Sequence, residues 1–381
     1  MKPRLLSYLS ITFVLLASCI VTSPIREKSG ETSQIAPKPG IITPTVFKEK
    51  TPLRVFCAGS LIRPFEDLEK AFEALHPEID VLMECHGSIQ VIRHVTELHE
   101  KIDVVATADY ALIPMLMYNS TDPETGKPYA NWHIRFAGNR LALAYTPQSQ
   151  SADQITPNNW YTILAQPGVR LGIADPRFDA SGYRALMALR LAEEAYNQPG
   201  IFKNLIEGRF KFPITLFEED DFTEISVPEI LEPRPDTGIL IRGASIQLIA
   251  LLESGDLDYA FEYESVIRQH GLEWVELPET INLGNEAYDP QYKQVQVKMD
   301  FRRFASVEPV FNGEQIGYGI TIPTNAPHPD QAAQFIGFLL GADGRRVMEA
   351  NFHPLKEQPL CDQTEEVPTE LRGFCPEEKS P

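Results

Sequence analysis

A regular alternation of strand-like and helix-like segments, starting near residue 53, constrains the fold more than any other feature of this sequence. The apolar run Leu53–Ala58 stops at Gly59-Ser60. It is followed by an apolar face with helical spacing, formed by Leu61, Phe65, Leu68, Phe72 and Leu75. A second strand-like run, Ile79–Glu84, stops at Gly87-Ser88 before another helical pattern. Strands that alternate with helices form parallel βαβ units, so the sequence predicts an α/β fold.

The same pattern returns along the rest of the chain. Strands are predicted over residues 102–106, 169–174, 259–263 and 317–322, and helices over residues 183–196, 248–252, 329–340 and 344–350. Residues 200–243 fit neither period, so we expect an irregular excursion there. A length of 381 residues corresponds to two or three domains.

The first residues are typical of an export signal. Lys2 and Arg4 precede the apolar run Leu5–Ala17, which is too short to cross a bilayer that requires about 20 apolar residues. The run ends in Leu-Ala-Ser-Cys, which is similar to the lipobox of bacterial lipoproteins. We therefore expect residues 1–19 to be a signal peptide whose Cys19 carries the lipid anchor. A plain secretory signal is the alternative. Residues 20–52, rich in proline and polar residues, are expected to form a flexible tether.

Four cysteines remain beyond this signal. In an exported protein they favour disulfides, and four cysteines allow three connectivities. Cys57 and Cys85 each lie near the end of a predicted strand, whereas Cys361 and Cys375 bracket an acidic C-terminal tail, residues 359–381. We therefore favour the pairs 57–85 and 361–375.

The net charge limits the classes of partner. The chain has 34 basic and 53 acidic residues, which gives a formal charge of −19. Such a chain repels phosphate backbones and anionic lipid. We therefore expect no nucleic-acid partner and no attachment to anionic lipid through basic patches.

Three glycine-serine turns are candidate binding elements. Gly59-Ser60, Gly87-Ser88 and Ser181-Gly182 each lie at a predicted strand-to-helix turn. Helix N-termini expose N–H groups and a partial positive charge, and ligands of open α/β sheets collect at the carboxyl ends of the strands. Converging on one point, the three turns would bind an anion without any Lys or Arg. The alternative is that each serine is only a helix N-cap.

Motifs for catalysis or for a resident metal ion are absent. There is no Walker A loop, GxGxxG, GxSxG or HExxH sequence. His86, His94 and His99 lack the i, i+4 spacing of a helical metal site, so we expect them to be structural or solvent-facing. We therefore expect no enzyme activity, no bound metal ion and no cofactor.

Seven stretches, in order, resemble the tungstate- and molybdate-binding proteins of ABC transporters. They are VFCAGSL from Val55, DVVATADY from Asp103, NWYTIL from Asn159, DASGYRALM from Asp179, DYAFEY from Asp258, RQHGLEWVELPETINLG from Arg268 and GYGITIPTNAPHP from Gly317. The resemblance implies a two-lobed α/β fold of the periplasmic-binding-protein type (type II-like), with the ligand in the cleft between the lobes. Mapped onto this chain, the first lobe comprises residues 53–134 and 264–358, and the second comprises residues 135–263.

The resemblance also implies a set of ligand-binding residues. They are Gly59, Ser60, Ser88, Asp179, Ala180, Ser181 and Tyr263, with Asp179 as a carboxylate that can reach the metal centre of the oxyanion. Where six-coordinate relatives have a second carboxylate, this chain has Ser245. Glu262 adjoins Tyr263, but successive side chains of a strand point to opposite faces, so we expect Glu262 to be a poor substitute.

From the signal sequence we expect an exported lipoprotein on the periplasmic or cell-surface side of the membrane, and we expect it to be a monomer. The resemblance implies the role of this lipoprotein. It would capture tungstate or molybdate and deliver the oxyanion to an ABC permease, closing its lobes by a hinge motion. A receptor for sulfate or phosphate is the first alternative. A cell-surface enzyme acting on a phosphorylated or sulfated substrate is the second.

Overall fold

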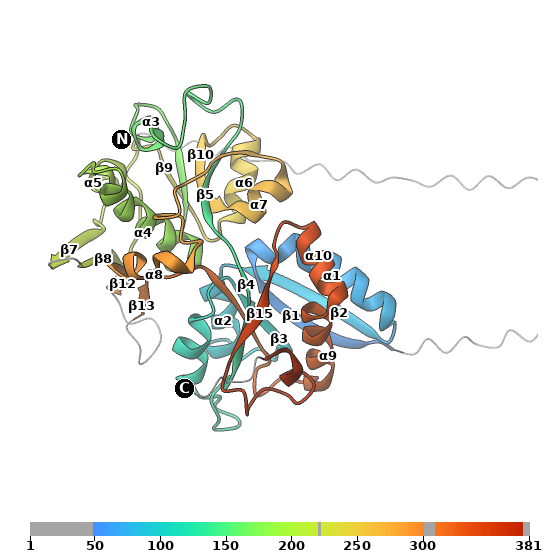
Figure 1. Cartoon of the computed structure of the whole chain (residues 1–381). Coiled ribbons are helices and arrows are strands. Elements are labelled where there is room, and N and C mark those ends of the chain that lie inside the picture. Colours follow the sequence, from blue (N-terminus) through green and yellow to red (C-terminus); the bar gives the residue numbers. More distant parts are fainter. Residues whose placement is uncertain (1–48, 220–221, 301–308, 376–381) are drawn as a thin grey trace, which may run out of the picture. The chain divides into compact units, whose positions relative to one another are not determined.

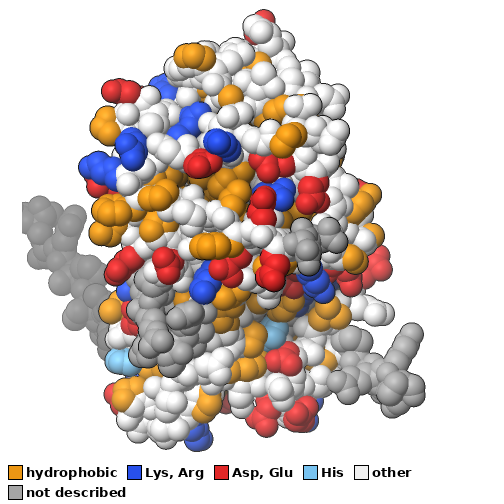
Figure 2. All heavy atoms as spheres, turned by 90° about the vertical axis from the view of Figure 1, so that its left-hand side faces the viewer, with side chains coloured by type: hydrophobic (Ala, Val, Ile, Leu, Met, Phe, Trp, Pro, Cys, Tyr) orange, Lys and Arg blue, Asp and Glu red, His pale blue; other side chains and the backbone are white. Residues whose placement is uncertain are grey.

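The computed structural model describes residues 49–219, 222–300 and 309–375 (Figure 1). The expected signal peptide, Cys19 and most of the expected tether lie outside the described residues. Within the described ranges, no helix is both long enough and apolar enough to cross a membrane. Figure 2 shows one face of the molecule, on which acidic and basic side chains are interspersed with apolar ones.

A six-stranded sheet in the order β15-β4-β14-β3-β1-β2 contains the first predicted strands. Its members are β1 (Thr51–Ala58), β2 (Ile79–His86), β3 (Val104–Thr107), β4 (His133–Gly138), β14 (Gly317–Thr321) and β15 (Leu355–Asp362). The strands β1, β2 and β3 are parallel, and the other three add in antiparallel pairs. The fold begins two residues before the expected end of the tether, because Thr51 and Pro52 already pair with β2.

Helices cover both faces of this sheet (Figure 1). On one face, α1 (Ile62–Leu75) follows a 3-10 turn at Gly59–Leu61 and packs with α9 (Pro329–Leu340) and α10 (Ala342–Ala350). On the other face, α2 (Ser88–Thr96) packs with a π-helical turn at Ile113–Tyr118. The apolar positions that predict α1 at Phe65, Leu68 and Phe72 are fully buried. Burial of this face is what holds the helix on the sheet.

The second large sheet has five strands in the order β11-β5-β10-β6-β9. Its strands are β5 (Leu141–Tyr145), β6 (Leu171–Ala174), β9 (Ile239–Arg242), β10 (Tyr259–Tyr263) and β11 (Glu273–Val275). The strands β10, β6 and β9 are parallel. Packed around this sheet are α3 (Trp160–Leu164), α4 (Ala180–Ala195), α5 (Ile201–Leu205), α6 (Ile246–Glu253) and α7 (Glu264–His270). The expected α/β fold class is confirmed.

A third sheet joins two strands of the segment that shows no clear period in the sequence, residues 200–243, to two later strands. It has the order β13-β12-β8-β7, with β7 (Thr215–Glu219), β8 (Phe222–Pro228), β12 (Val295–Asp300) and β13 (Val310–Asn312). Short helical segments precede β12, namely a 3-10 turn at Glu286–Tyr288 and α8 (Asp289–Tyr292). The excursion expected over residues 200–243 contains α5 and the strands β7, β8 and β9. Because β7 is largely exposed, its sequence lacks the alternation of apolar and polar residues that predicts a strand.

Strand pairing differs from the expected division of the chain in one respect. Residues 264–358 were assigned to the first lobe, yet β11 pairs with β5, and β12 pairs with β8. Both partners lie in the segment 135–263 assigned to the second lobe. The division was carried over from the resemblance as whole blocks of sequence, whereas the tertiary structure determines which strands pair.

Residues 359–375 of the expected acidic C-terminal tail are part of the fold. The strand β15 pairs with β4, and Val367 and Leu371 are fully buried. A 3-10 turn follows at Arg372–Phe374. Disulfides join Cys361 to Cys375, and Cys57 to Cys85 across neighbouring positions of β1 and β2. These are the two pairs that the sequence favours.

Candidate functional site

The carboxyl ends of six parallel strands meet between the two larger sheets. They belong to β1, β2 and β3 in the six-stranded sheet and to β6, β9 and β10 in the five-stranded sheet. The loops after these strands touch: the N–H of Ile89 donates to the carbonyl oxygen of Phe178 at 3.1 Å. A Cβ at Gly59 would lie 3.1 Å from the side chain of Ile246. Ligands of open α/β sheets bind at such carboxyl ends, so this junction is the candidate site.

Two serine hydroxyls from the six-stranded sheet are buried at this junction. Ser60 follows β1, and its Oγ lies 2.8 Å from the phenolic oxygen of Tyr318. Ser88 is the first residue of α2, and its Oγ accepts the N–H of Ala108 at 2.9 Å. Because the Ser88 oxygen already accepts a hydrogen bond, its own hydroxyl proton can be donated to a ligand.

Gly87, which precedes Ser88, has no room for a side chain. A Cβ at this position would lie 2.4 Å from the carbonyl oxygen of Phe178 and 3.0 Å from that of Gly243. Both carbonyls belong to loops of the five-stranded sheet. The close approach of the two halves of the site therefore depends on glycine at position 87.

Asp179 caps α4 from the five-stranded sheet. Its Oδ1 accepts both the N–H of Ser181, at 2.8 Å, and the hydroxyl of Ser181, at 2.9 Å. Its Oδ2 accepts the N–H of Ser245 at 3.2 Å. Burial raises the pKa of Asp179, and these hydrogen bonds oppose that rise. Ala180, the first residue of α4, is fully buried beside this cap.

Glu262 is also part of this cluster, on the face of β10 opposite to Tyr263, as strand parity predicts. Its Oε1 accepts the hydroxyl of Ser245 at 3.0 Å and the N–H of Tyr263 at 2.7 Å. Glu262 and Tyr263 do point to opposite faces: Glu262 contacts Ser245 before α6, whereas Tyr263 contacts Arg184 on α4. Both reach the site because α4 and α6 begin at the same end of the sheet.

The carboxyl group of Glu262 is unusual in its burial. The residue is fully buried, and its Oε2 has no hydrogen-bond partner among the described residues. Burial raises its pKa to about 8, a rise to which the negative charge of Asp179 also contributes, while its two hydrogen bonds lower it. At neutral pH Glu262 is therefore mostly protonated and offers a hydrogen-bond donor.

Arg184 is a site residue that the sequence reasoning missed, since it expected an anion site without basic residues. Its Nη1 donates to the carbonyl oxygen of Ala108 and to the phenolic oxygen of Tyr263, each at 2.7 Å. Its Nη2 lies 3.3 Å from Asp109. The phenol of Tyr183 also donates to Asp109. The available signal was a charged residue followed directly by an apolar run, Ala185–Leu189, within a predicted helix.

Comparison with known proteins identifies the family. The sequence model for bacterial extracellular solute-binding proteins matches residues 53–352, well over half of the chain. The chain belongs to this family. This solute-binding protein is 40% identical over 307 residues to a solute-binding protein of Methanoculleus marisnigri, covering 80% of this chain and 82% of the relative. It is 35% identical over 334 residues to the molybdate/tungstate-binding protein WtpA of Thermococcus kodakarensis, covering 86% and 88%.

The structure of this solute-binding protein brings most of the residues named from the sequence to one junction. Gly59, Ser60 and Ser88 come from one sheet, and a second group comes from the other, namely Asp179, Ala180, Ser181, Ser245 and Tyr263. The arrangement differs from expectation at Ser181, whose N–H and hydroxyl are both donated to Asp179. Tyr318 joins the set through Ser60.

Proposed function

We propose that this solute-binding protein captures tungstate or molybdate outside the cytoplasm and delivers the oxyanion to an ABC permease without changing it chemically. The observation that carries the proposal is the convergence of six strand ends on a junction that holds the buried hydroxyls of Ser60 and Ser88 and the N-termini of α2, α4 and α6. The relative from Thermococcus kodakarensis that is named for molybdate and tungstate binding supports the choice of ligand.

The chemistry of the junction suits a compact dianion. Helix N-termini attract anions through their N–H groups and partial positive charge. Hydrogen bonds to a charged acceptor are roughly twice as strong as bonds between neutral groups. Ser60 and Ser88 supply hydroxyl donors, and protonated Glu262 supplies an acid proton. The guanidinium of Arg184 adds a buried positive charge that Asp109 partly balances.

Asp179 is our candidate for selectivity against sulfate. Tungsten and molybdenum in their oxyanions are large centres that accept additional oxygen ligands, whereas sulfur in sulfate does not. A carboxylate at the site therefore attracts the metal oxyanions and repels sulfate. With Ser245 in the place of a second carboxylate and Glu262 protonated, Asp179 is the one acid that we assign to this role.

The cellular setting of the proposal comes from the start of the chain. We propose that cleavage before Cys19 leaves a lipid-anchored monomer, held at the membrane surface by residues 20–50 and facing the periplasm or the cell exterior. Several acyl chains make a durable anchor, since each buried methylene contributes about 0.8 kcal/mol.

A panel of oxyanions tests the proposed ligand. Thermal unfolding of the purified protein is followed with tungstate, molybdate, sulfate, phosphate and a phosphate monoester, and isothermal titration calorimetry gives the affinities. We expect tungstate and molybdate to raise the melting temperature at concentrations where sulfate and phosphate do not, because a bound ligand stabilises the folded state. Preferential stabilisation by sulfate or phosphate would replace the proposal with the first alternative. Turnover of the monoester would favour the enzyme.

A further inference from the structure

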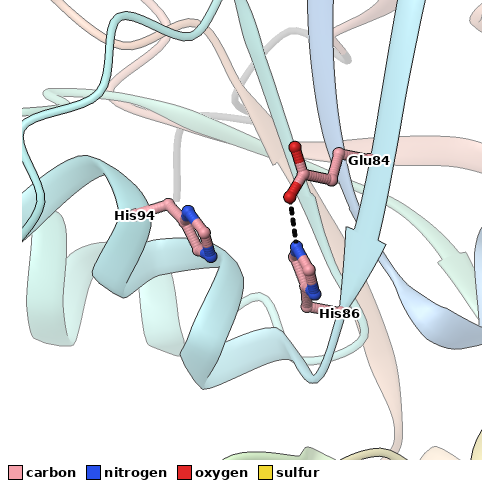
Figure 3. A group of neighbouring side chains, drawn as sticks. All are labelled: Glu84, His86 and His94. Carbon is pink, nitrogen blue, oxygen red and sulfur yellow. Dashed lines mark hydrogen bonds and ion pairs between the residues drawn. The ribbon is translucent and has the colours of Figure 1, made fainter. Parts of the chain in front are cut away.

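Three potential metal ligands gather on the surface of the six-stranded sheet, outside the candidate oxyanion site (Figure 3). They are Glu84 and His86 of β2 and His94 of α2, and one ligand atom from each lies within 4.8 Å of the others. The Nε2 of His86 lies 2.8 Å from Oε1 of Glu84. The imidazole rings of His86 and His94 stack with their centroids 4.9 Å apart and their planes 7° from parallel.

The fold explains why these residues meet. Glu84 and His86 are two positions apart on β2, so they share one face of the sheet. α2 packs across that face and brings His94 to the same place (Figure 3). Phe56, which pairs with Glu84 across β1 and β2, contacts both rings edge-on, with centroid distances of 6.2 Å to His86 and 5.2 Å to His94. The two imidazoles are therefore held by packing rather than free in solvent.

The carboxylate of Glu100 holds one ring nitrogen of His94, as is usual for histidines that bind metal ions. The Nδ1 of His94 lies 2.7 Å from Oε1 of Glu100. The other oxygen of Glu100 accepts a hydrogen bond from Arg54 at 2.6 Å. A histidine that ligates a metal almost always donates its other ring N–H to such an acceptor. This arrangement leaves Nε2 of His94 available, and in Figure 3 this atom points toward His86.

We propose that Glu84, His86 and His94 form a surface site for a divalent transition-metal ion of the zinc class, with water completing the coordination. Two imidazoles and one carboxylate are ligands that suit zinc, copper or nickel, whereas calcium and magnesium prefer oxygen alone. Zinc–ligand bonds of about 2.1 Å place tetrahedral ligand atoms about 3.4 Å apart. Glu84, whose side chain is 49% exposed, has room to turn toward such a geometry.

The site is separate from the proposed oxyanion chemistry and can be tested without any oxyanion. His86 nevertheless precedes Gly87-Ser88 directly, and Cys85 beside it is joined to Cys57 of β1. A metal ion bridging β2 and α2 would fasten the turn that carries Ser88. Failure of the metal site would leave the proposed ligand of the junction unaffected.

Zinc titration of the full chain, in a chelator-treated buffer without oxyanions, tests the proposal. Isothermal titration calorimetry is expected to give one zinc ion per chain, and cobalt substitution is expected to give the visible absorption of a four-coordinate ion. Glu84→Gln, His86→Gln and His94→Gln are each expected to weaken zinc binding at least tenfold. Glu84→Gln is the most informative of these variants, because Glu84 is exposed and its loss leaves the packing of the rings intact.

His76→Gln is the matched control. His76 and Glu78 form a pair with the same two-residue spacing, 3.6 Å apart, on another part of the surface. This variant is expected to bind zinc like the parent. Three outcomes would overturn the proposal. The parent binds no stoichiometric zinc, Glu84→Gln binds zinc as tightly as the parent, or His76→Gln loses as much affinity as the ligand variants. Circular dichroism of every variant confirms that a lost signal reflects the ligand rather than the fold.

Discussion

Ser60 and Ser88 are the residues through which the proposed oxyanion site is tested most directly. Each supplies one buried hydroxyl at a strand end. Ser60→Ala and Ser88→Ala are each expected to weaken tungstate binding by about 1.5–3 kcal/mol, the cost of losing a hydrogen bond to a charged group. Isothermal titration calorimetry measures this change.

Ser254→Ala is the control for these variants. Ser254 lies just after α6, is exposed, and its hydroxyl bonds to Asp256 at 2.8 Å. Its substitution should leave tungstate binding unchanged. Parent-like affinity in both Ser60→Ala and Ser88→Ala would show that these two hydroxyls do not hold the ligand.

Ionisation of Glu262 should make the affinity for tungstate depend on pH. Its pKa, raised to about 8 by burial, lies above its unfolded value, so the acid is protonated in the folded protein at neutral pH. A bound dianion opposes ionisation further. Affinity should therefore fall as the pH rises through about 8, by up to about tenfold per pH unit for one linked proton.

Glu262→Gln separates this effect from general alkaline weakening. Glutamine retains a donor but does not ionise, so tungstate affinity at pH 7 should be nearly preserved and its decline above pH 8 should disappear. The same pKa shift affects folding stability. Between the pKa of Glu262 in the unfolded chain and about 8, the residue ionises only when the chain unfolds, so rising pH favours the unfolded state. The variant should gain stability over the parent as pH rises through that window. An unchanged pH profile in Glu262→Gln would contradict the assignment.

At the scale of elements, the turn between β2 and α2 controls how closely the two halves of the site approach. Gly87→Ala would place a Cβ 2.4 Å from the carbonyl oxygen of Phe178, so the two loops must separate. We expect this variant to fold but to bind tungstate at least tenfold more weakly. Small-angle scattering should show a smaller ligand-induced compaction than in the parent.

Gly337→Ala in α9 is the matched control for Gly87→Ala. A Cβ at Gly337 meets only Leu371 at 3.6 Å, an ordinary contact, and alanine favours a helix. Its binding and compaction should match the parent. A Gly87→Ala protein that binds and compacts normally would mean that ligand binding does not require this contact.

At the scale of the whole molecule, the chain leaves the six-stranded sheet and returns to it at connections that lie side by side, the return coming from β13 of the third sheet. Asn139-Arg140 joins β4 to β5, and residues 313–316 join β13 to β14. The N–H of Leu141 donates to Asn282, and that of Ile316 donates to Leu283. Asn139 also donates to Tyr318, which contacts Ser60. We infer that bending at these connections accompanies ligand binding, which fits a hinge motion.

The proposed anchor is a prediction for the whole chain in its cell. Cys19→Ala removes the sulfur that would carry the lipid, so the variant should appear in the soluble fraction or retain its uncleaved signal. Membrane fractionation and intact mass measure this change. Cys57→Ala in the folded body, which leaves the lipobox intact, should remain with the membrane. Identical mass and fractionation of Cys19→Ala and the parent would rule out lipidation at this position.

Local patterns in the sequence predicted the elements well, because helical and strand periods are set by consecutive residues. The face of α1 and the bounds of β10 and α9 follow the sequence closely. The positions of Ser60 and Ser88 also follow, since a serine after a strand-ending glycine lies at the carboxyl end of a parallel sheet. The resemblance to binding proteins, rather than periodicity, supplied Asp179 and Tyr263.

Tertiary structure alone decided which distant groups share an environment. The contact of Glu262 with Ser245 depends on α4 and α6 converging from opposite faces of one sheet. Arg184 joins Ala108 across 76 residues, and His86 meets His94 although one lies on a strand and the other on a helix. Spacing along the chain reports only contacts within one element. Burial and the contacts between elements arise only when the sheets and helices pack. Packing therefore determined the positions of Glu262, of Arg184 and of the proposed metal site.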